Sequence, residues 1–340
     1  EDKLFVYGIY KLQDDIVSNS FIRAGVTNVD ERDDPVWGTK IDFFPLDNHH
    51  LEYTYFDTST TTVRTSSGYS YDEDTGEDTF GDINGTTLYE QGGESWVGKY
   101  TGTLADWVTL SAAYGVSNDS FSVLPSNTGN LVIDATTAGG GAYLSTQTVG
   151  SKQSPSTTRR EFYRADADFF FDFFGDHHVR VGLDNEKNTL QNISVRTGLD
   201  NIDGGGTAVA PGGVVYRLLE CGATTDQCLA TAELSTGDYY VGIDYFNSGG
   251  EFDAENTSYY IQDQWGVTDR LTVNLGVRWD DFANFTADGT QFVDLKENIG
   301  PRLGFSYDVF GDAKTRLYGN YGVYYLPVAS NTAFRMYGSE

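Results

Sequence analysis

The feature that most limits the fold of this chain is a strict alternation of side-chain polarity, which is clearest between positions 298 and 325. From Ile299 to Val309 every second residue is apolar, aromatic or proline, and the residues between them are glycine, arginine, serine and aspartate. After an FGDAK turn the alternation resumes at Leu317. A period of two is the repeat of a β-strand, whose successive side chains point to opposite faces. The stretch therefore predicts two strands that share one apolar and one polar face.

The same period recurs along the chain. It is clear in HHLEYTYF, EFYRADADFFFDFF, HHVRVGLDNE and LTVNLGVRW, at 49–56, 161–174, 177–186 and 271–279. We expect about eleven such strands, several of which reach the ~9–11 residues that a tilted strand needs to cross a bilayer. The chain holds 23 Tyr, 21 Phe and 39 Gly, a composition that favours an all-β fold. No run of ~18 apolar residues occurs, which excludes a transmembrane helix.

Short and long connections alternate between these strands. Short polar turns fall within 43–53, 102–110, 171–181, 264–273 and 307–318, whereas long segments rich in Gly, Ser, Thr, Asn and Asp fall near 58–92, 117–157, 190–254 and 283–297. Compact soluble domains seldom contain several loops beyond about 15 residues. Transmembrane β-barrels combine short periplasmic turns with long outer loops. We therefore expect 1–340 to be part of one antiparallel transmembrane β-barrel domain, with these four segments as extracellular loops.

A soluble β-sandwich would also alternate, so the placement of the aromatic residues is used to choose between the two. Phe169, Phe171 and Phe173 approach one turn, and Trp265 and Trp279 lie near strand ends. Aromatic residues at both interfaces are typical of membrane barrels. The apolar face is thus expected to contact lipid, and the polar face to line a lumen.

The charge and the cysteine content of the chain limit which binding partners and metal sites can be expected. Asp and Glu number 50 against 22 Lys and Arg, a formal net charge of -28, whereas binding to nucleic acid needs a basic surface. Cys221 and Cys228 lie close together without a nearby histidine. A loop-closing disulfide of an exported protein is therefore expected in place of a zinc site.

Two neighbouring stretches resemble a known family. SYYIQDQWGVTDRLTVNLGVRWDDF at 258–282, followed by NIGPRLGFSYDVFGDAKTRLYGNYGVYYLP at 298–327, is similar to the barrel of TonB-dependent outer-membrane receptors. In that family YxQDxW, LxxNxGxRW and PRxGxxYD follow one another, and all three stand here in that order. The resemblance is to the Oar-like group, in which a carboxypeptidase-regulatory-like domain precedes the plug. It implies a 22-stranded barrel closed around a plug. This chain would supply about half of those strands, without the plug and the N-terminal TonB-contacting segment.

The resemblance also implies a function. We expect energised uptake of an unidentified ligand, or surface traffic, through a plugged barrel in the outer membrane of a Gram-negative bacterium. The partners would be the TonB complex, the ligand, and the surrounding lipid and lipopolysaccharide, with the loops exposed at the cell surface. The alternative is a structural or adhesive outer-membrane barrel whose acidic loops bind neighbouring surfaces without transport.

We expect neither a bound cofactor nor an enzymatic reaction. No GxSxG motif occurs. The pairs His49-His50 and His177-His178 lie in short turns, and adjacent strand residues point to opposite faces, so a pair chelates one ion poorly.

The acidic tract YDEDTGEDTFGD at 71–82 offers a candidate calcium site. Calcium takes several oxygen ligands, which could come from Asp72, Asp74, Glu77, Asp78 and Asp82. The spacing is not that of an EF-hand, and a solvated loop explains the tract as well.

Charged residues stand at strand centres on the expected polar face. The lumen-facing candidates are Arg160, Arg164, Asp166, Asp168, Arg180, Asp184, Arg278, Arg302 and Arg316. In a plugged barrel such residues pair with each other across strands, pair with the plug, or contact the ligand. We expect Arg164 or Asp166 to pair with Arg180 or Asp184, with the register left open.

Overall fold

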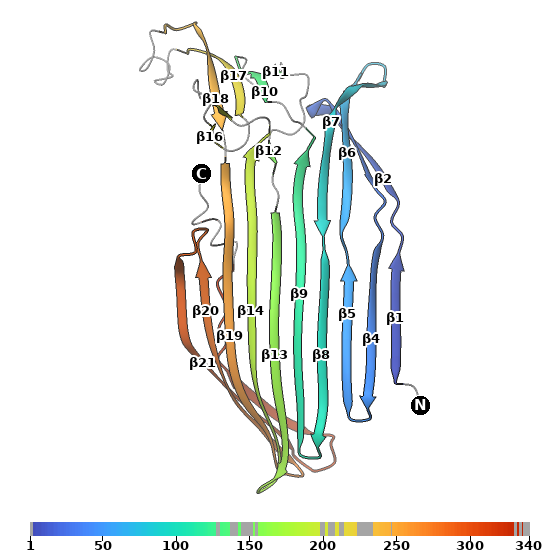
Figure 1. Cartoon of the computed structure of the whole chain (residues 1–340), viewed down its shortest axis with the longest axis vertical. Coiled ribbons are helices and arrows are strands. Elements are labelled where there is room, and N and C mark those ends of the chain that lie inside the picture. The colour runs from blue at the N-terminus through green and yellow to red at the C-terminus, as the bar shows by residue number, and fades with distance from the viewer. Residues whose placement is uncertain are drawn as a thin grey trace.

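The wall of this molecule is one curved antiparallel sheet, a single strand thick (Figure 1). The computed structural model describes residues 3–126, 130–136, 142–143, 152–153, 156–197, 201–202, 208–210, 214–222, 234–245 and 247–329, with Thr332 and Arg335. Among them, eleven strands follow one another along the main path of the sheet, which confirms the predicted antiparallel all-β fold. The sheet is open, because its two outermost strands do not pair with each other. No helix in this part of the chain is long and apolar enough to cross a membrane.

Several strands of the main path are longer than a membrane span requires. In order they are β1 (Leu4–Lys11), β4 (Val36–Leu46), β5 (His49–Asp57), β8 (Glu94–Ala105), β9 (Val108–Pro125), β13 (Ser156–Asp172), β14 (Asp176–Arg196), β19 (Asn247–Thr268), β20 (Leu271–Phe285), β21 (Gln291–Asp308) and β22 (Arg316–Gly322). The expected length was ~9–11 residues, yet β13, β14 and β19 contain 17, 21 and 22 residues. The backbone ladder therefore continues well past the thickness of a bilayer.

The five predicted short turns all lie at one end of the sheet. They join β4 to β5, β8 to β9, β13 to β14, β19 to β20 and β21 to β22, and the first three are seen at the lower edge of Figure 1. The turn between β13 and β14 requires glycine. Gly175 has a φ of 118°, and a Cβ placed there would lie 2.3 Å from the carbonyl oxygen of Gly266.

The segment near 58–92, expected as an outer loop, is a paired hairpin of β6 (Thr60–Tyr71) and β7 (Asp78–Gly92). Strand β7 pairs with β9 at Gly92–Ser120, just above the last β8–β9 pair, Ser95–Ser117. A further hairpin of β2 (Asp15–Phe21) and β3 (Val26–Arg32), joined by the 3-10 turn η1 (Ile22–Ala24), pairs with β6. Strands β2 and β3 were not among those predicted from the sequence. Figure 1 shows β6 and β7 standing above β5 and β8, so these hairpins form an upper tier of the wall.

The other expected loops are shorter than predicted or are partly described. Strands β20 and β21 reduce the segment near 283–297 to a connection at 286–290. The segments near 117–157 and 190–254 contain the short strands β10 (Leu131–Asp134), β11 (Ala142–Tyr143), β12 (Lys152–Gln153), β15 (Asn201–Ile202), β16 (Ala208–Ala210), β17 (Val214–Glu220) and β18 (Tyr239–Tyr245). Cys221 follows β17 and is buried, whereas Cys228 lies outside the described residues, so their disulfide stays a prediction.

A single layer leaves both faces open, and therefore the described residues form no compact core. The largest fully buried side chains are Phe252, Val215, Asn284 and Cys221. The register places Leu275 opposite Leu303 on one face, and both are exposed. On the other face Arg302 lies opposite Gly276. The predicted division into an apolar and a polar face thus holds across neighbouring strands.

Candidate functional site

The polar face carries a row of charged side chains across β13, β14, β20, β21 and β22. Strand pairing places all nine candidates from the sequence on this one face: Arg160, Arg164, Asp166, Asp168, Arg180, Asp184, Arg278, Arg302 and Arg316. They share it because the strands between them pair without a register shift over these positions, so the two-residue period stays in phase.

A first group of these charges is centred on Asp184. Arg164 lies opposite Asp184 on the next strand, with its Nη2 atom 2.7 Å from Asp184 Oδ2. Arg278 Nη2 lies 3.8 Å from the same oxygen, and Arg278 Nε lies 2.7 Å from Asp280 Oδ1. Ser258 donates a hydrogen bond to Asp280 at 2.6 Å. Two guanidinium groups and two carboxylates thus neutralise one another across four strands.

A second group is centred on Asp168, whose side chain is only 8% exposed. Arg180, opposite it on β14, donates to its two oxygens from Nε at 2.7 Å and Nη2 at 3.2 Å. His178 Nε2 lies 2.6 Å from Asp168 Oδ1. His178 is therefore part of this charge group, although the sequence analysis treated it as a turn residue.

The structure also adds partners that the sequence analysis missed. The hydroxyl of Tyr260 donates to Asp166, and Arg160 forms an ion pair with Glu186. Glu186 could have been found from the sequence. It lies two residues after Asp184 on β14, and its side chain therefore points to the same face. Tyr260 could not, since its pairing depends on the approach of a strand distant in sequence.

Two of the predicted arginines differ from the rest. Arg302 and Arg316 form no ion pair with any residue that the structure describes, although Arg316 lies opposite Asp308 in register. The guanidinium of Arg302 instead lies over the ring of Tyr324, 5.0 Å from its centroid.

Near the turn end of β4 and β5 the polar face carries a further cluster. Within the described ranges, Asp42, His50 and Glu52 are the one trio of possible metal ligands whose ligand atoms lie within 4.8 Å of one another. Lys40 Nζ lies 2.8 Å from Glu52 and 3.4 Å from Asp42. Since this ammonium group already contacts both carboxylates, we assign no metal here. The neighbouring His49 points to the other face, where its Nδ1 lies 2.8 Å from the hydroxyl of Tyr100.

The calcium candidates lie around the tip of the β6–β7 hairpin. Asp72 Oδ1 accepts the backbone N–H groups of Asp74 and Thr75 at 2.9 and 3.2 Å, and Asp78 accepts the hydroxyl of Tyr69 at 2.5 Å. The five candidates Asp72, Asp74, Glu77, Asp78 and Asp82 do not bring three ligand atoms together. Calcium binding here stays a prediction.

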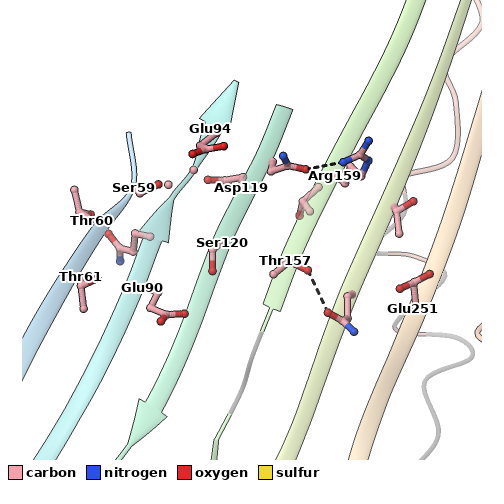
Figure 2. A pocket seen from close by; sticks show the side chains of 17 residues that line it. Ser59, Thr60, Thr61, Glu90, Glu94, Asp119, Ser120, Thr157, Arg159 and Glu251 are labelled. Atoms are coloured by element: carbon pink, nitrogen blue, oxygen red, sulfur yellow. Dashed lines mark hydrogen bonds between the residues drawn. The ribbon is translucent and has the colours of Figure 1, made fainter. Parts of the chain in front are cut away.

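A polar pocket lies on the face opposite the row of charges, at the height where the upper tier begins (Figure 2). Its cavity volume is about 650 Å³, and its lining includes Thr61, Glu90, Glu94, Ser120, Arg159 and Glu251. Thr157 donates a hydrogen bond to Gln191 at 3.3 Å, and Arg159 donates one to Asn118 at 3.4 Å. Both bonds are drawn as dashed lines in Figure 2. The pocket forms because β9 changes its partner from β8 to β7 at this height.

The crossing of chains at this pocket is tight. Thr58 donates its N–H to the carbonyl oxygen of Gly93 at 3.0 Å. Gly92 has a φ of 75°, and a Cβ there would lie 2.1 Å from the carbonyl oxygen of Thr58. Only glycine fits this position without displacement of the backbone.

Comparison with known proteins agrees with this architecture. The model of the family described as "Outer membrane beta barrel domain" matches residues 11–297. The TonB-dependent transporter Oar of Myxococcus xanthus is 24% identical over 206 residues, which are 59% of this chain and 17% of that protein. The crystal structure of the outer membrane transporter YddB from Escherichia coli superposes with a TM-score of 0.50 at 11% identity, over 93% of this chain and 38% of that one.

The chain thus spans well under half the length of these relatives, 17% of Oar and 38% of YddB. The likeness to YddB concerns the fold, and it fits a wall that is open because it is part of a larger barrel. This chain belongs to the outer membrane β-barrel domain family and forms part of a barrel in the bacterial outer membrane.

Proposed function

We propose that this chain is part of the barrel of a TonB-dependent receptor that takes up a ligand across the outer membrane. The observation that carries the proposal is the pairing of charges on the polar face, opposite an apolar face bounded by aromatic residues. Similarity to the transporter Oar supports it.

The apolar face has the two aromatic belts of a membrane barrel. At the upper belt the ring centroids of Trp37 and Tyr55 lie 4.9 Å apart, and those of Trp96 and Tyr114 lie 5.4 Å apart. At the lower belt, towards the short turns, the ring of His177 stacks between Phe171 and Trp265 at 5.1 and 5.4 Å.

The spacing of the belts fits a bilayer. On β13 they are marked by Tyr163 and Phe171, so the stretch from one belt to the other is about nine residues long. A tilted strand needs ~9–11 residues to cross a bilayer. The belts support a placement in which lipid contacts this face between them.

The polar face would then line the lumen. Barrels of about eight strands fill their interior with side chains, whereas 22-stranded transporters hold a plug. Eleven strands in an open path require a barrel wider than eight strands. Mutual neutralisation of Arg164, Asp184, Arg278 and Asp280 suits a wet lumen that must hold a plug without a strong field of one sign.

The proposal includes partners that would act through parts of the polypeptide beyond this segment. A plug would close the lumen, and the TonB complex would supply energy from the inner membrane. The upper tier and outer loops would meet the ligand first. The barrel itself would carry out no covalent chemistry and would need no bound cofactor.

A second candidate function is a structural or adhesive barrel, favoured by the polar outer pocket and the acidic hairpin tip. In that case the pocket of Figure 2 and the tip around Asp72 would contact a neighbouring surface, and the lumen would carry no traffic.

The native polypeptide should first be extracted from outer membranes in detergent, and its intact mass measured. A mass more than twice the 37.5 kDa of this chain would accommodate the plug and the remaining strands. A mass near 37.5 kDa would overturn the transport function. On the same preparation, cross-linking to the periplasmic domain of TonB should succeed for a receptor and fail for an adhesive barrel.

A further inference from the structure

One arginine on the polar face has no carboxylate partner in the described part of the chain. Strand pairing aligns Arg180 on β14, Gln262 on β19, Gly276 on β20 and Arg302 on β21 in one row across the wall. Arg180 is neutralised by Asp168. Arg302, at the other end of the row, has no carboxylate partner among the residues that the structure describes.

The Nε–H group of Arg302 is buried and has no hydrogen-bond acceptor among the residues that the structure describes. Contact with the ring of Tyr324 supplies a favourable cation–π interaction but no acceptor for this N–H group. A buried donor left unsatisfied costs free energy, and in native proteins such groups have an acceptor in more than about 90% of cases. The guanidinium group is therefore set up for an acceptor that the described chain does not supply.

Arg302 borders a cavity of about 340 Å³ on this face. Gly276 and Gly304 lie among its lining residues, and a Cβ at Gly276 would lie 3.2 Å from the Cβ of Gln262. Because glycine has no side chain, both positions leave space beside Arg302 for a bound group. Four amide side chains also border the cavity: Gln262, Gln264, Asn274 and Asn320.

The charge balance of the cavity limits what it can hold. Arg180 and Arg278, which also border it, are each paired with an aspartate, Asp168 and Asp280. Asp263 borders it through its strand, but its carboxylate lies on the opposite face, 2.7 Å from His177 Nδ1. His178 also borders the cavity, and its Nε2 atom lies 2.6 Å from Asp168 Oδ1. Among the arginines that border the cavity, Arg302 alone therefore lacks a carboxylate partner in the described part of the chain.

We propose that this cavity, the Arg302 pocket, binds a carboxylate group. A carboxylate has one negative charge and two coplanar oxygens, which match the fork formed by Nε and one terminal nitrogen of a guanidinium group. A dianionic phosphate would need a second unpaired cation. The amides offer further N–H donors around the same space. The proposal rests on the proposed function, because the group must reach the pocket from a lumen.

The carboxylate has two possible sources, which one experiment separates. It belongs either to another part of the same polypeptide, such as a plug, or to a diffusible molecule in the lumen.

The full-length protein, purified from outer membranes in detergent, is heated in potassium chloride and in potassium acetate of the same ionic strength. The variants are Arg302→Gln and Arg302→Lys. Arg316→Gln is the matched control, since Arg316 lies on the same face and also forms no ion pair with a described residue.

A diffusible carboxylate predicts that acetate raises the Tm of the wild type and of Arg316→Gln by about 2 °C or more, and leaves Arg302→Gln unchanged. A carboxylate from the polypeptide predicts no response to acetate in the wild type, but a Tm lowered in Arg302→Gln and partly restored in Arg302→Lys. Arg302→Lys keeps the positive charge, and it can be measured in place of Arg302→Gln if that variant does not fold.

If acetate has no effect and Arg302→Gln is at least as stable as the wild type, the pocket binds no carboxylate. The acetate response does not involve TonB. A protein that responds to acetate but fails to cross-link to TonB would therefore retain the pocket and lose the transport function.

Discussion

Asp168 and Arg180 lie opposite each other on β13 and β14, and both oxygens of the aspartate accept hydrogen bonds from the one guanidinium group, at 2.7 and 3.2 Å. The aspartate is 8% exposed and the arginine 41% exposed, so the pair is buried at one end and hydrated at the other. Its contribution to stability should fall between that of a surface pair and that of a fully buried pair.

Asp168→Asn should therefore destabilise the barrel by about 1–3 kcal/mol, because Arg180 and His178 both lose their charged acceptor. The free energy of unfolding in urea, measured in lipid vesicles, tests this. Arg316→Gln, which removes a charge on the same face without breaking an ion pair, should change it by less than about 0.5 kcal/mol. Equal effects of the two substitutions would contradict the role of Asp168.

The pair of Arg164 and Asp184 provides a test of the register. A double-mutant cycle with Arg164→Gln and Asp184→Asn should give a coupling energy of about 0.5–1 kcal/mol, since Arg164 is 51% exposed and solvent screens the pair. A cycle between Arg164 and Glu186, which lies on β14 opposite Phe162, serves as the control and should give a smaller coupling. A larger coupling in the control would show that the two strands are shifted.

The two faces of β9 should respond in opposite ways to a new charge. Ala112 lies on the apolar face opposite Ala165, and Ser111 lies on the polar face opposite Asp166. Ala112→Arg should cost about 2–4 kcal/mol because it places a cation against the hydrocarbon. Ser111→Arg, beside a carboxylate, should cost less than about 1 kcal/mol. Refolding into vesicles of defined thickness would measure both, and a similar cost for both would contradict the assignment of the faces.

The tight crossing at Gly92 should matter for the upper tier and not for the wall below it. Gly92→Ala should destabilise the β6–β7 hairpin by about 1–3 kcal/mol, since its φ is 75° and the new Cβ would meet the carbonyl oxygen of Thr58. Gly98→Ala is the matched control, because a Cβ there meets nothing within 4 Å. Limited proteolysis at the hairpin should be faster in Gly92→Ala alone.

The tip of the same hairpin should depend on pH in a defined direction. Backbone N–H groups of Thr75 and Asp74 donate to Asp72 and hold the pKa of this carboxyl below its ordinary value of 3.8. A depressed folded-state pKa means that the stabilisation is present above 3.8 and is lost as the pH falls through the lower, folded-state value. The amide proton shifts of Asp74 and Thr75 in nuclear magnetic resonance spectra should titrate with a midpoint below 3.8, and this step should vanish in Asp72→Asn.

The sequence by itself determined the class of fold, the two faces and the lower end of the wall. Alternation such as that from Ile299 to Val309 fixes which side chains share a face, because the period of a strand is two whatever its neighbours are. The five short turns could be located for the same reason, since each interrupts the alternation with a few polar residues. The placement of Arg164 and Asp184 on one face follows from parity alone.

Only the tertiary structure decided which strands lie side by side and at what height. The partner change of β9 from β8 to β7, the pairing of β3 with β6, and the contact of Tyr260 with Asp166 each join segments that do not follow one another in sequence. Sequence patterns report the face of a residue but not its register against another strand. For the same reason the unpaired state of Arg302 could not be predicted. Its parity matches that of the paired arginines. That no carboxylate of the described residues lies next to it appears only once the strands are aligned.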